Sequence, residues 1–203
     1  MSLFLSLDGL DGSGKSTQLG LLCQWLRERG HTLTTCRDPG STPLGEKLRG
    51  ILLAGDGLSI SRTSEMLMYM AARAQLVSET IEPALARGET VVSDRFLLAN
   101  VVYQGHAGGL DVETLWRIGR VATRELEPRL TVVLDLPADD AARRISRPLD
   151  RMERQGEAFN AAVRRGFLTE ARRRPDHIVV VDAARAIEVV QADIRAAVEK
   201  VLP

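Results

Sequence analysis

The sequence predicts an α/β fold in three layers, with a five-stranded parallel sheet flanked by helices. Short apolar runs, typical of buried strands, alternate along the chain with longer stretches that are apolar at helical spacing. A glycine-rich turn joins the first of these strands to the first helix. No repeat, low-complexity tract or linker divides the 203 residues, so we expect a single domain over residues 1–203.

The predicted strands are short, and helices lie between them. Strands are expected at residues 3–7, 32–36, 90–94, 129–136 and 177–181. Helices are expected at residues 15–30, 42–55, 61–89 and 111–128, with others between and after the last two strands. Gly30 ends the first helix, and Pro83 is expected to break the long one. Strands that alternate with helices form right-handed βαβ units, which make the sheet parallel and cover both of its faces.

The segment least suited to regular structure is SRPLDRMERQGEA, residues 146–158. It is rich in arginine and contains Pro148 and Gly156. We predict that this segment forms a mobile, arginine-rich lid.

Composition and charge exclude several classes of protein. Lysine and arginine together number 27, as do aspartate and glutamate, and this balance argues against a protein built mainly to bind nucleic acid. No apolar run approaches the ~20 residues of a membrane span, and the start MSLFLSLDG lacks the features of a signal peptide. Cys23 and Cys36 fall on a predicted helix and strand, so we expect core residues rather than a disulfide, and a cytoplasmic protein.

The stretch GLDGSGKS, residues 9–16, matches the pattern G-x-x-x-x-G-K-[ST] between a predicted strand and a predicted helix. We call these residues the phosphate loop. Its glycines let successive N–H groups turn toward phosphate oxygens, and the start of the helix adds positive charge. Lys15 would reach the β- and γ-phosphates, and Ser16 would hold Mg²⁺. The loop predicts a P-loop NTPase fold; the other interpretation is a plain turn with incidental glycines.

Charged residues also stand where two other strands end. Arg37 follows the second predicted strand, and Asp94 and Arg95 stand at the end of the third. Ligands of open parallel sheets bind outside the carboxyl ends of the strands. Two arginines beside a triphosphate loop indicate a second phosphate, and hence a kinase whose acceptor is itself a phosphate. The alternatives are a solvated loop arginine for Arg37 and a surface ion pair for Asp94 and Arg95.

Tyr69 and Arg73 lie one turn apart on the long predicted helix and share a face. An aromatic ring and a guanidinium on one face can stack on a base and hydrogen-bond it. The alternatives are an exposed helix arginine at position 73 and a stripe of ordinary core packing.

Five motifs, in this order, carry a likeness to a known family: SLDGLDGSGKSTQ, RDPGSTPLGEKLRGILL, EMLMYMAARAQLVSETIEPAL, VVSDRFLLANVVYQG and LDRME. Through them the chain resembles bacterial thymidylate kinases along nearly its full length. The resemblance implies transfer of the ATP γ-phosphate to dTMP, giving dTDP and ADP for dTTP synthesis. It also implies Mg²⁺ as the metal, ATP and dTMP as the small-molecule partners, and a homodimer.

The resemblance further implies roles for single residues. ATP binding falls to Gly9, Leu10, Asp11, Gly12, Ser13, Gly14, Lys15, Ser16, Thr17 and Arg143. dTMP binding falls to Asp11, Arg37, Tyr69, Arg73, Arg95, Asn100, Tyr103 and Gln104. Arg37 and Arg95 look like the residues that hold the dTMP phosphate, and Tyr103 like the residue that crowds out a ribose 2′-hydroxyl. Ser16 and Asp94 look like the groups that hold and orient Mg²⁺.

Some members of the family carry an arginine directly after the loop aspartate, and it covers the transferring phosphate. That position is Gly12 in this chain, so the lid must supply the positive charge. Our hypothesis is that Arg147 or Arg151 closes over the bridge between the β- and γ-phosphates. The expected catalytic set is therefore Lys15, Asp94, Arg95, Arg147 and Arg151.

Two other functions stay open from the sequence. One is another nucleotide or deoxynucleoside kinase with the same loop, which would prefer a different acceptor. The other is a nucleotide-dependent switch or binding module, although the guanine-reading pattern N-K-x-D is absent. We expect neither a membrane nor a nucleic-acid partner.

Overall fold

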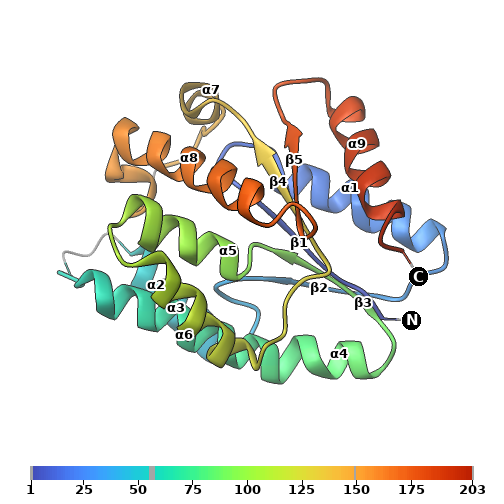
Figure 1. Cartoon of the computed structure of the whole chain (residues 1–203), viewed down its shortest axis with the longest axis horizontal. Coiled ribbons are helices and arrows are strands. Elements are labelled where there is room, and N and C mark those ends of the chain that lie inside the picture. Colours follow the sequence, from blue (N-terminus) through green and yellow to red (C-terminus); the bar gives the residue numbers. More distant parts are fainter. Residues whose placement is uncertain (1, 55–57, 149, 203) are drawn as a thin grey trace.

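A computed structural model describes residues 2–54, 58–148 and 150–202. Its strands form one parallel sheet in the order β2-β3-β1-β4-β5 (Figure 1). Their bounds are β1 Phe4–Gly9, β2 Leu33–Arg37, β3 Thr90–Asp94, β4 Leu130–Asp135 and β5 Ile178–Asp182. The prediction of a five-stranded parallel sheet is confirmed.

The sheet explains the apolar runs that predicted it. β1, β3 and β4 occupy its centre, and nearly all of their residues are buried, because helices cover both faces of these strands. The edge strands β2 and β5 are only partly buried. Phe4 of β1 meets Phe96 edge to face, with ring centroids 4.9 Å apart, so the core continues from the sheet into the helices.

Helices surround the sheet on both sides. Figure 1 shows the sheet between the pair α1 and α9 and a larger group that includes α3, α5, α6 and α8. The bounds are α1 Lys15–Glu28, α2 Pro43–Leu53, α3 Arg62–Leu76, α4 Glu82–Ala86, α5 Leu97–Asn100, α6 Val112–Thr123, α7 Ala138–Arg143, α8 Glu157–Arg173 and α9 Ile187–Glu199. No helix in the described ranges is long and apolar enough to span a bilayer.

Side-chain caps define where three of these helices begin. Thr42, Ser61 and Asp111 each accept a hydrogen bond from the backbone N–H three residues later. Ser61 thus starts α3, the helix in which Tyr69 and Arg73 are buried.

The expected break at Pro83 does not occur. α3 continues into a π-helical segment, Val77–Ile81, which leads directly into α4. Pro83 is the second residue of α4 and comes directly after the π-helical segment, so the continuous helical stretch accommodates it there. The helix predicted over 111–128 also ends early, at Thr123, because Arg124 and Glu125 adopt positive φ values of 54° and 62°.

One helical element was not predicted. α5 continues into a second π-helical segment, Val101–Ala107, which packs against α8. In the lid the described residues hold a three-residue 3₁₀ helix, Glu153–Gln155, before α8 begins at Glu157. Leu149 of the predicted lid and Gly55 of the predicted helix 42–55 lie outside the described residues.

Candidate active site

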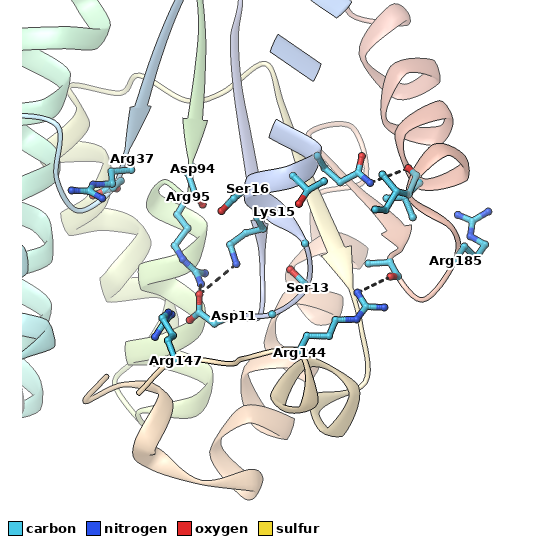
Figure 2. A pocket seen from close by; sticks show the side chains of 18 of the residues that line it. Asp11, Ser13, Lys15, Ser16, Arg37, Asp94, Arg95, Arg144, Arg147 and Arg185 are labelled. Carbon is cyan, nitrogen blue, oxygen red and sulfur yellow. Dashed lines mark hydrogen bonds and ion pairs between the residues drawn. The ribbon is translucent and has the colours of Figure 1, made fainter. Parts of the chain in front are cut away.

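The strand ends bring the predicted residues together. Arg37 at the end of β2 pairs in register with Asp94 at the end of β3, and Leu7 of β1 also pairs with Asp94. A cleft of about 710 Å³ opens at this edge of the sheet (Figure 2). The predicted residues that line it are Asp11, Gly12, Ser13, Gly14, Lys15, Ser16, Thr17, Arg37, Asp94, Arg95 and Arg147. Gly9 and Leu10 belong to the same loop but do not line the cleft.

Gly12 and Gly14 both have positive φ values in the phosphate loop, and each is needed for a different reason. Gly14 has a φ of 92° directly before α1, so the first turn of that helix opens toward the cleft. Gly12 has a φ of 83°, and a Cβ there would lie 2.1 Å from the carbonyl oxygen of Ala141 in α7. α7 therefore packs directly onto the loop, and an arginine at position 12 would not fit this arrangement.

Lys15, Asp11 and Arg95 form a charged cluster at the centre of the cleft (Figure 2). The Lys15 Nζ donates to the carbonyl oxygens of Leu10 at 2.8 Å and Gly9 at 3.2 Å. The Arg95 guanidinium donates to the Gly9 carbonyl at 2.9 Å and to Asp11 Oδ1 at 2.8 Å. The Lys15 Nζ also lies 3.6 Å from Asp11 Oδ1.

Burial and charge set the protonation of this cluster. Burial alone would raise the pKa of Asp11, but the charges of Arg95 and Lys15 outweigh it and hold that pKa well below its usual range. Burial, followed by the charge of Arg95, lowers the pKa of Lys15 to about 8. At neutral pH the cluster therefore presents one carboxylate and two cations to the cleft.

Asp94 at the end of β3 and Ser16 in the first turn of α1 both offer oxygen atoms to the cleft. Asp94 Oδ1 is buried and has no hydrogen-bond partner among the residues that the structure describes. Ser16 is exposed in the first turn of α1, and both side chains line the cleft. Carboxylate and hydroxyl oxygens suit a hard divalent cation such as Mg²⁺. Within the described residues no three His, Cys, Asp or Glu side chains form a metal cage, so such an ion would need phosphate oxygens as well.

A second cavity, of about 90 Å³, joins the cleft and is lined by the other group of predicted residues. It is lined by Tyr69 and Arg73 of α3 and by Asn100, Tyr103 and Gln104 of α5 and its π-helical continuation. Asp11, Arg95 and Arg147 are among the residues that line both hollows, so the two hollows adjoin there.

Arg73 is the most deeply buried cation of this second cavity. Its side chain is about 2% exposed, donating to Asp38 Oδ2 at 2.6 Å and to Asn100 Oδ1 at 2.9 Å. The interpretation of Arg73 as an exposed helix residue is therefore wrong. Tyr69 is also largely buried but lines the cavity, so this face of α3 is not core packing alone.

Tyr103 lines the second cavity and lies against Arg95, which lines both hollows. The Arg95 guanidinium lies over its ring, 5.2 Å from the centroid, and the rings of Phe159 and Phe167 each meet it edge to face with centroids 6.2 Å away. Burial raises the pKa of Tyr103, so its hydroxyl stays protonated near neutral pH. The packing holds this ring rigidly beside Asp11, which lines the same cavity.

The two lid arginines proposed as fingers, Arg147 and Arg151, lie in different environments. Arg147 lines both hollows, and its guanidinium makes a two-pronged pair with Glu153 at 2.7 and 2.8 Å. Arg151 lines neither hollow. It donates to the carbonyl oxygen of Leu52 at 2.7 Å and to the carboxylate of Glu65. The structure therefore places only one of the two candidate finger residues at the cleft.

Arg143, the predicted ATP-binding residue after β4, is 72% exposed and pairs with Asp140 on its own helix. It does not line the cleft. The next residue, Arg144, does line it and donates to the carbonyl oxygen of Ala183 at 3.4 Å. The geometry thus favours Arg144, the residue that follows the end of α7, over Arg143 at this position.

Sequence reasoning missed several residues of the site. Arg185 lines the far end of the cleft in the loop after β5 (Figure 2). The rule that identified Arg37 and Arg95, charged residues just beyond a strand end, would have found it. Gln18 and Arg49 also line the cleft. Asp135, another carboxylate at a strand end, is held by Arg164 at 2.7 and 2.8 Å and takes no part in the lining.

Comparisons with known proteins agree with this geometry. The sequence model of the thymidylate kinase family matches residues 7–194. The chain is 48% identical over 204 residues to a thymidylate kinase of Symbiobacterium thermophilum, covering all of this chain and 95% of that one. It is 46% identical over 192 residues to one of Rhodopirellula baltica, covering 95% and 78%.

Among solved structures, the crystal structure of thymidylate kinase from Ehrlichia chaffeensis superposes with a TM-score of 0.78. It is 27% identical, and the match covers 97% of this chain and 98% of that one. A P-loop, strand-end arginines and an adjoining second cavity thus occur in a chain that matches the family over nearly its full length, and the chain belongs to the thymidylate kinase family.

Proposed function

We propose that this chain is an ATP-dependent kinase that transfers the γ-phosphate of ATP to dTMP, giving dTDP and ADP. The observation that carries the proposal is the pair of adjoining cavities. A phosphate loop lies at one end, a pocket with an aromatic ring and a buried arginine lies at the other, and Asp11, Arg95 and Arg147 line the junction. In-line phosphoryl transfer needs two phosphates held at such a junction.

The ATP phosphates would bind along residues 9–17. The N–H groups of the loop and the first turn of α1 supply donors and positive charge. In the present geometry the Lys15 Nζ is bound to two loop carbonyls, and a phosphate oxygen would compete for it. Arg144 and Arg185 line the cleft beyond the loop, so we propose that they border the remainder of the nucleotide.

Ser16 and Asp94 would hold Mg²⁺, as the unpartnered buried oxygen of Asp94 supports. When bound, the ion would screen the charge of the phosphate oxygens and help align them. The residues of the chain do the rest. Arg95 and Arg37 attract the acceptor phosphate to the junction, and Asp11, kept ionised by Arg95, would accept a hydrogen bond from the sugar 3′-hydroxyl.

The acceptor base would lie in the second cavity. Tyr69 would stack on it, and Arg73 and Asn100 would hydrogen-bond its edge, since all three line that space. Tyr103 and Gln104 would contact the sugar and base. The rigid packing of Tyr103 against two phenylalanine rings supports its proposed role in excluding a ribose 2′-hydroxyl.

Of the lid residues, we propose Arg147 as the group that covers the transferring phosphate. It lines both hollows and is exposed enough to move. Release from Glu153 would free both prongs of its guanidinium for phosphate oxygens. The same closure would exclude water, which limits hydrolysis of ATP.

We also propose a homodimer and a cytoplasmic location. Exposed apolar side chains support the first proposal, among them Leu67 on α3 and Val121 on α6. The second proposal follows from the substrates, ATP and dTMP. Sedimentation of the purified chain would test the dimer.

The proposed function is tested by an ADP-release assay with Mg·ATP and one acceptor at a time. The acceptors are dTMP, dUMP, dCMP, dGMP, AMP, GMP and thymidine, with a control that lacks any acceptor. We expect release that depends strongly on dTMP, with dUMP second. A preference for thymidine or another monophosphate would be consistent with kinase activity but would contradict dTMP as the acceptor. ADP release that does not depend on any acceptor would contradict kinase activity.

A further inference from the structure

A buried carboxylate behind the acceptor cavity links two parts of the site. Glu65 lies on α3, one turn before Tyr69, and its side chain is about 1% exposed. One of its oxygens accepts a hydrogen bond from the Gln104 Nε2 at 2.9 Å. The other accepts from the guanidinium of Arg151 in the lid segment. Glu65 does not line either hollow itself, so any effect on substrate must pass through its partners.

From Glu65, a chain of hydrogen bonds runs through the side-chain amides of Gln104 and Asn100 to Arg73. Gln104 Oε1 accepts from Asn100 Nδ2 at 2.6 Å, and Asn100 Oδ1 accepts from Arg73 Nη1 at 2.9 Å. A guanidinium can only donate, and an ionised carboxylate can only accept. With Arg73 at one end and Glu65 at the other, each of the two amides has one satisfied orientation. If either amide were reversed, a buried donor would face a donor or a buried acceptor would face an acceptor. The lost hydrogen bond costs free energy.

The orientation of the amides determines what the cavity wall offers to a base. Asn100 and Gln104 both line the acceptor cavity. A thymine edge presents a carbonyl acceptor where cytosine presents an amino donor. A reversed amide would exchange donor and acceptor at the wall, and would therefore weaken the preference for one pyrimidine over the other.

The lid side of the contact holds Arg151 in place. Besides Glu65, its Nε donates to the Leu52 carbonyl at 2.7 Å, and its backbone N–H lies 3.4 Å from the carbonyl oxygen of Leu53. Arg147, four residues earlier in the lid, lines both hollows. The anchored arginine thus ties the lid to α2 and α3 within reach of the phosphate junction.

We propose that Glu65 is a positioning residue that serves both ends of the acceptor site. It sets the orientation of the Gln104 and Asn100 amides, which selects the base, and it anchors the lid through Arg151. This inference rests on the proposed function for its kinetic consequence, but the contacts themselves do not depend on it.

The test compares E65Q with wild type and with E79Q, a matched control on the helical continuation of α3 where Glu79 is exposed. Glutamine offers both a donor and an acceptor, so it no longer forces the orientation of Gln104, and its NH₂ group faces a cation. We expect the ratio of kcat/KM for dTMP over dCMP to fall about tenfold in E65Q. KM for dTMP should rise while KM for ATP is retained, and E79Q should match wild type in each respect.

A second measurement does not depend on activity. Hydrogen exchange of the backbone amides in residues 150–158 should be faster in E65Q and in R151K than in wild type, because each change weakens the anchor. R151K should keep the wild-type ratio of dTMP over dCMP, since it leaves the carboxylate on Gln104. If E65Q does not fold, R151K still tests the anchor.

An E65Q protein with the wild-type ratio and the wild-type exchange rate would overturn the inference. A wild type that phosphorylates no dTMP would instead contradict the proposed function. In that case the exchange comparison would still show whether Glu65 holds the lid.

Discussion

Arg147 and Arg151 are only four residues apart, yet their guanidinium groups contact different parts of the molecule. Arg151 is held against α2 and α3 by the Leu52 carbonyl and Glu65. Arg147 is paired with a neighbour in the lid and borders the hollow where the two phosphates would meet. The sequence offers both as candidate fingers, but only Arg147 lines the hollow where the phosphates would meet.

Replacing Arg147 by alanine should therefore lower kcat about 10³-fold, since it removes the charge that we assign to the transferring phosphate. KM for either substrate should change much less. The matched control is R154A, because Arg154 is an exposed lid arginine whose Nε donates to the backbone carbonyl of Asp150. Steady-state kinetics of the two variants would decide the matter: equal activity in both would remove Arg147 from the mechanism.

The buried carboxyl group of Asp8 predicts how the free energy of unfolding depends on pH. It is buried in β1, and burial raises its pKa from 3.8 to about 7, although Arg95 and Lys15 lower it and Asp94 and Asp38 raise it further. Between about pH 4 and pH 7 the folded protein keeps a proton that the unfolded chain has released. The free energy of unfolding should therefore fall as the pH rises through this window, by at most about 1.4 kcal/mol for each pH unit.

D8N carries no charge at any pH, so its free energy of unfolding should fall less than that of wild type between pH 5 and pH 8. Urea unfolding of the ligand-free protein at both pH values measures this difference. D176N serves as the control, since Asp176 is exposed in the loop before β5. A wild type and a D8N protein with parallel pH dependence would show that Asp8 does not titrate as described.

At the scale of elements, the contact between α7 and the phosphate loop decides how the loop is supported. A Cβ at position 12 would overlap the Ala141 carbonyl, and the backbone at Gly12 has a positive φ. We expect G12A to push α7 away from the loop, to lower stability by about 2 kcal/mol, and to reduce turnover. G20A is the control, because Gly20 lies in α1 with no atom within 4 Å of an added Cβ. Thermal unfolding of both variants tests this, and a G12A protein as stable as G20A would contradict it.

Strands, phosphate loop and strand-end arginines could be predicted because their signals are local. An apolar run of five residues or a glycine pattern carries its meaning wherever the chain places it. The helical segment that begins at Leu97 could not, since Val101 and Val102 are β-branched and no polar periodicity surrounds them. Its helical form depends on packing against α8, which lies far along the chain.

The charged residues also differ in whether their surroundings could be predicted from local sequence signals. Arg73 has the sequence context of an exposed helix residue, but Asp38 and Asn100 from two other elements surround it. Glu65 gave one local signal, its spacing of four and eight residues from Tyr69 and Arg73 on the same helix face. What the face would meet could not be predicted from the spacing alone, because it is set by how α3 and the second π-helical segment pack.

At the scale of the whole molecule, the two hollows share their lining, and we propose that residues 1–203 form a single kinase domain. A ligand at either end should then stabilise the same cooperative unit. A non-hydrolysable ATP analogue or dTMP, each at about 100 times its Kd, should add about 2.7 kcal/mol to the free energy of unfolding. For a chain of this size that corresponds to a rise in Tm of about 5–10 °C.

The two ligands together should raise the same single transition further than either alone, because the cleft and the acceptor cavity are distinct hollows that meet at Asp11, Arg95 and Arg147. Scanning calorimetry with each ligand and with both measures this. Two separate transitions, one responding to each ligand, would contradict the single domain. Mutual exclusion of the ligands would mean that the junction cannot hold two phosphates at once, and in-line transfer across it would then be ruled out.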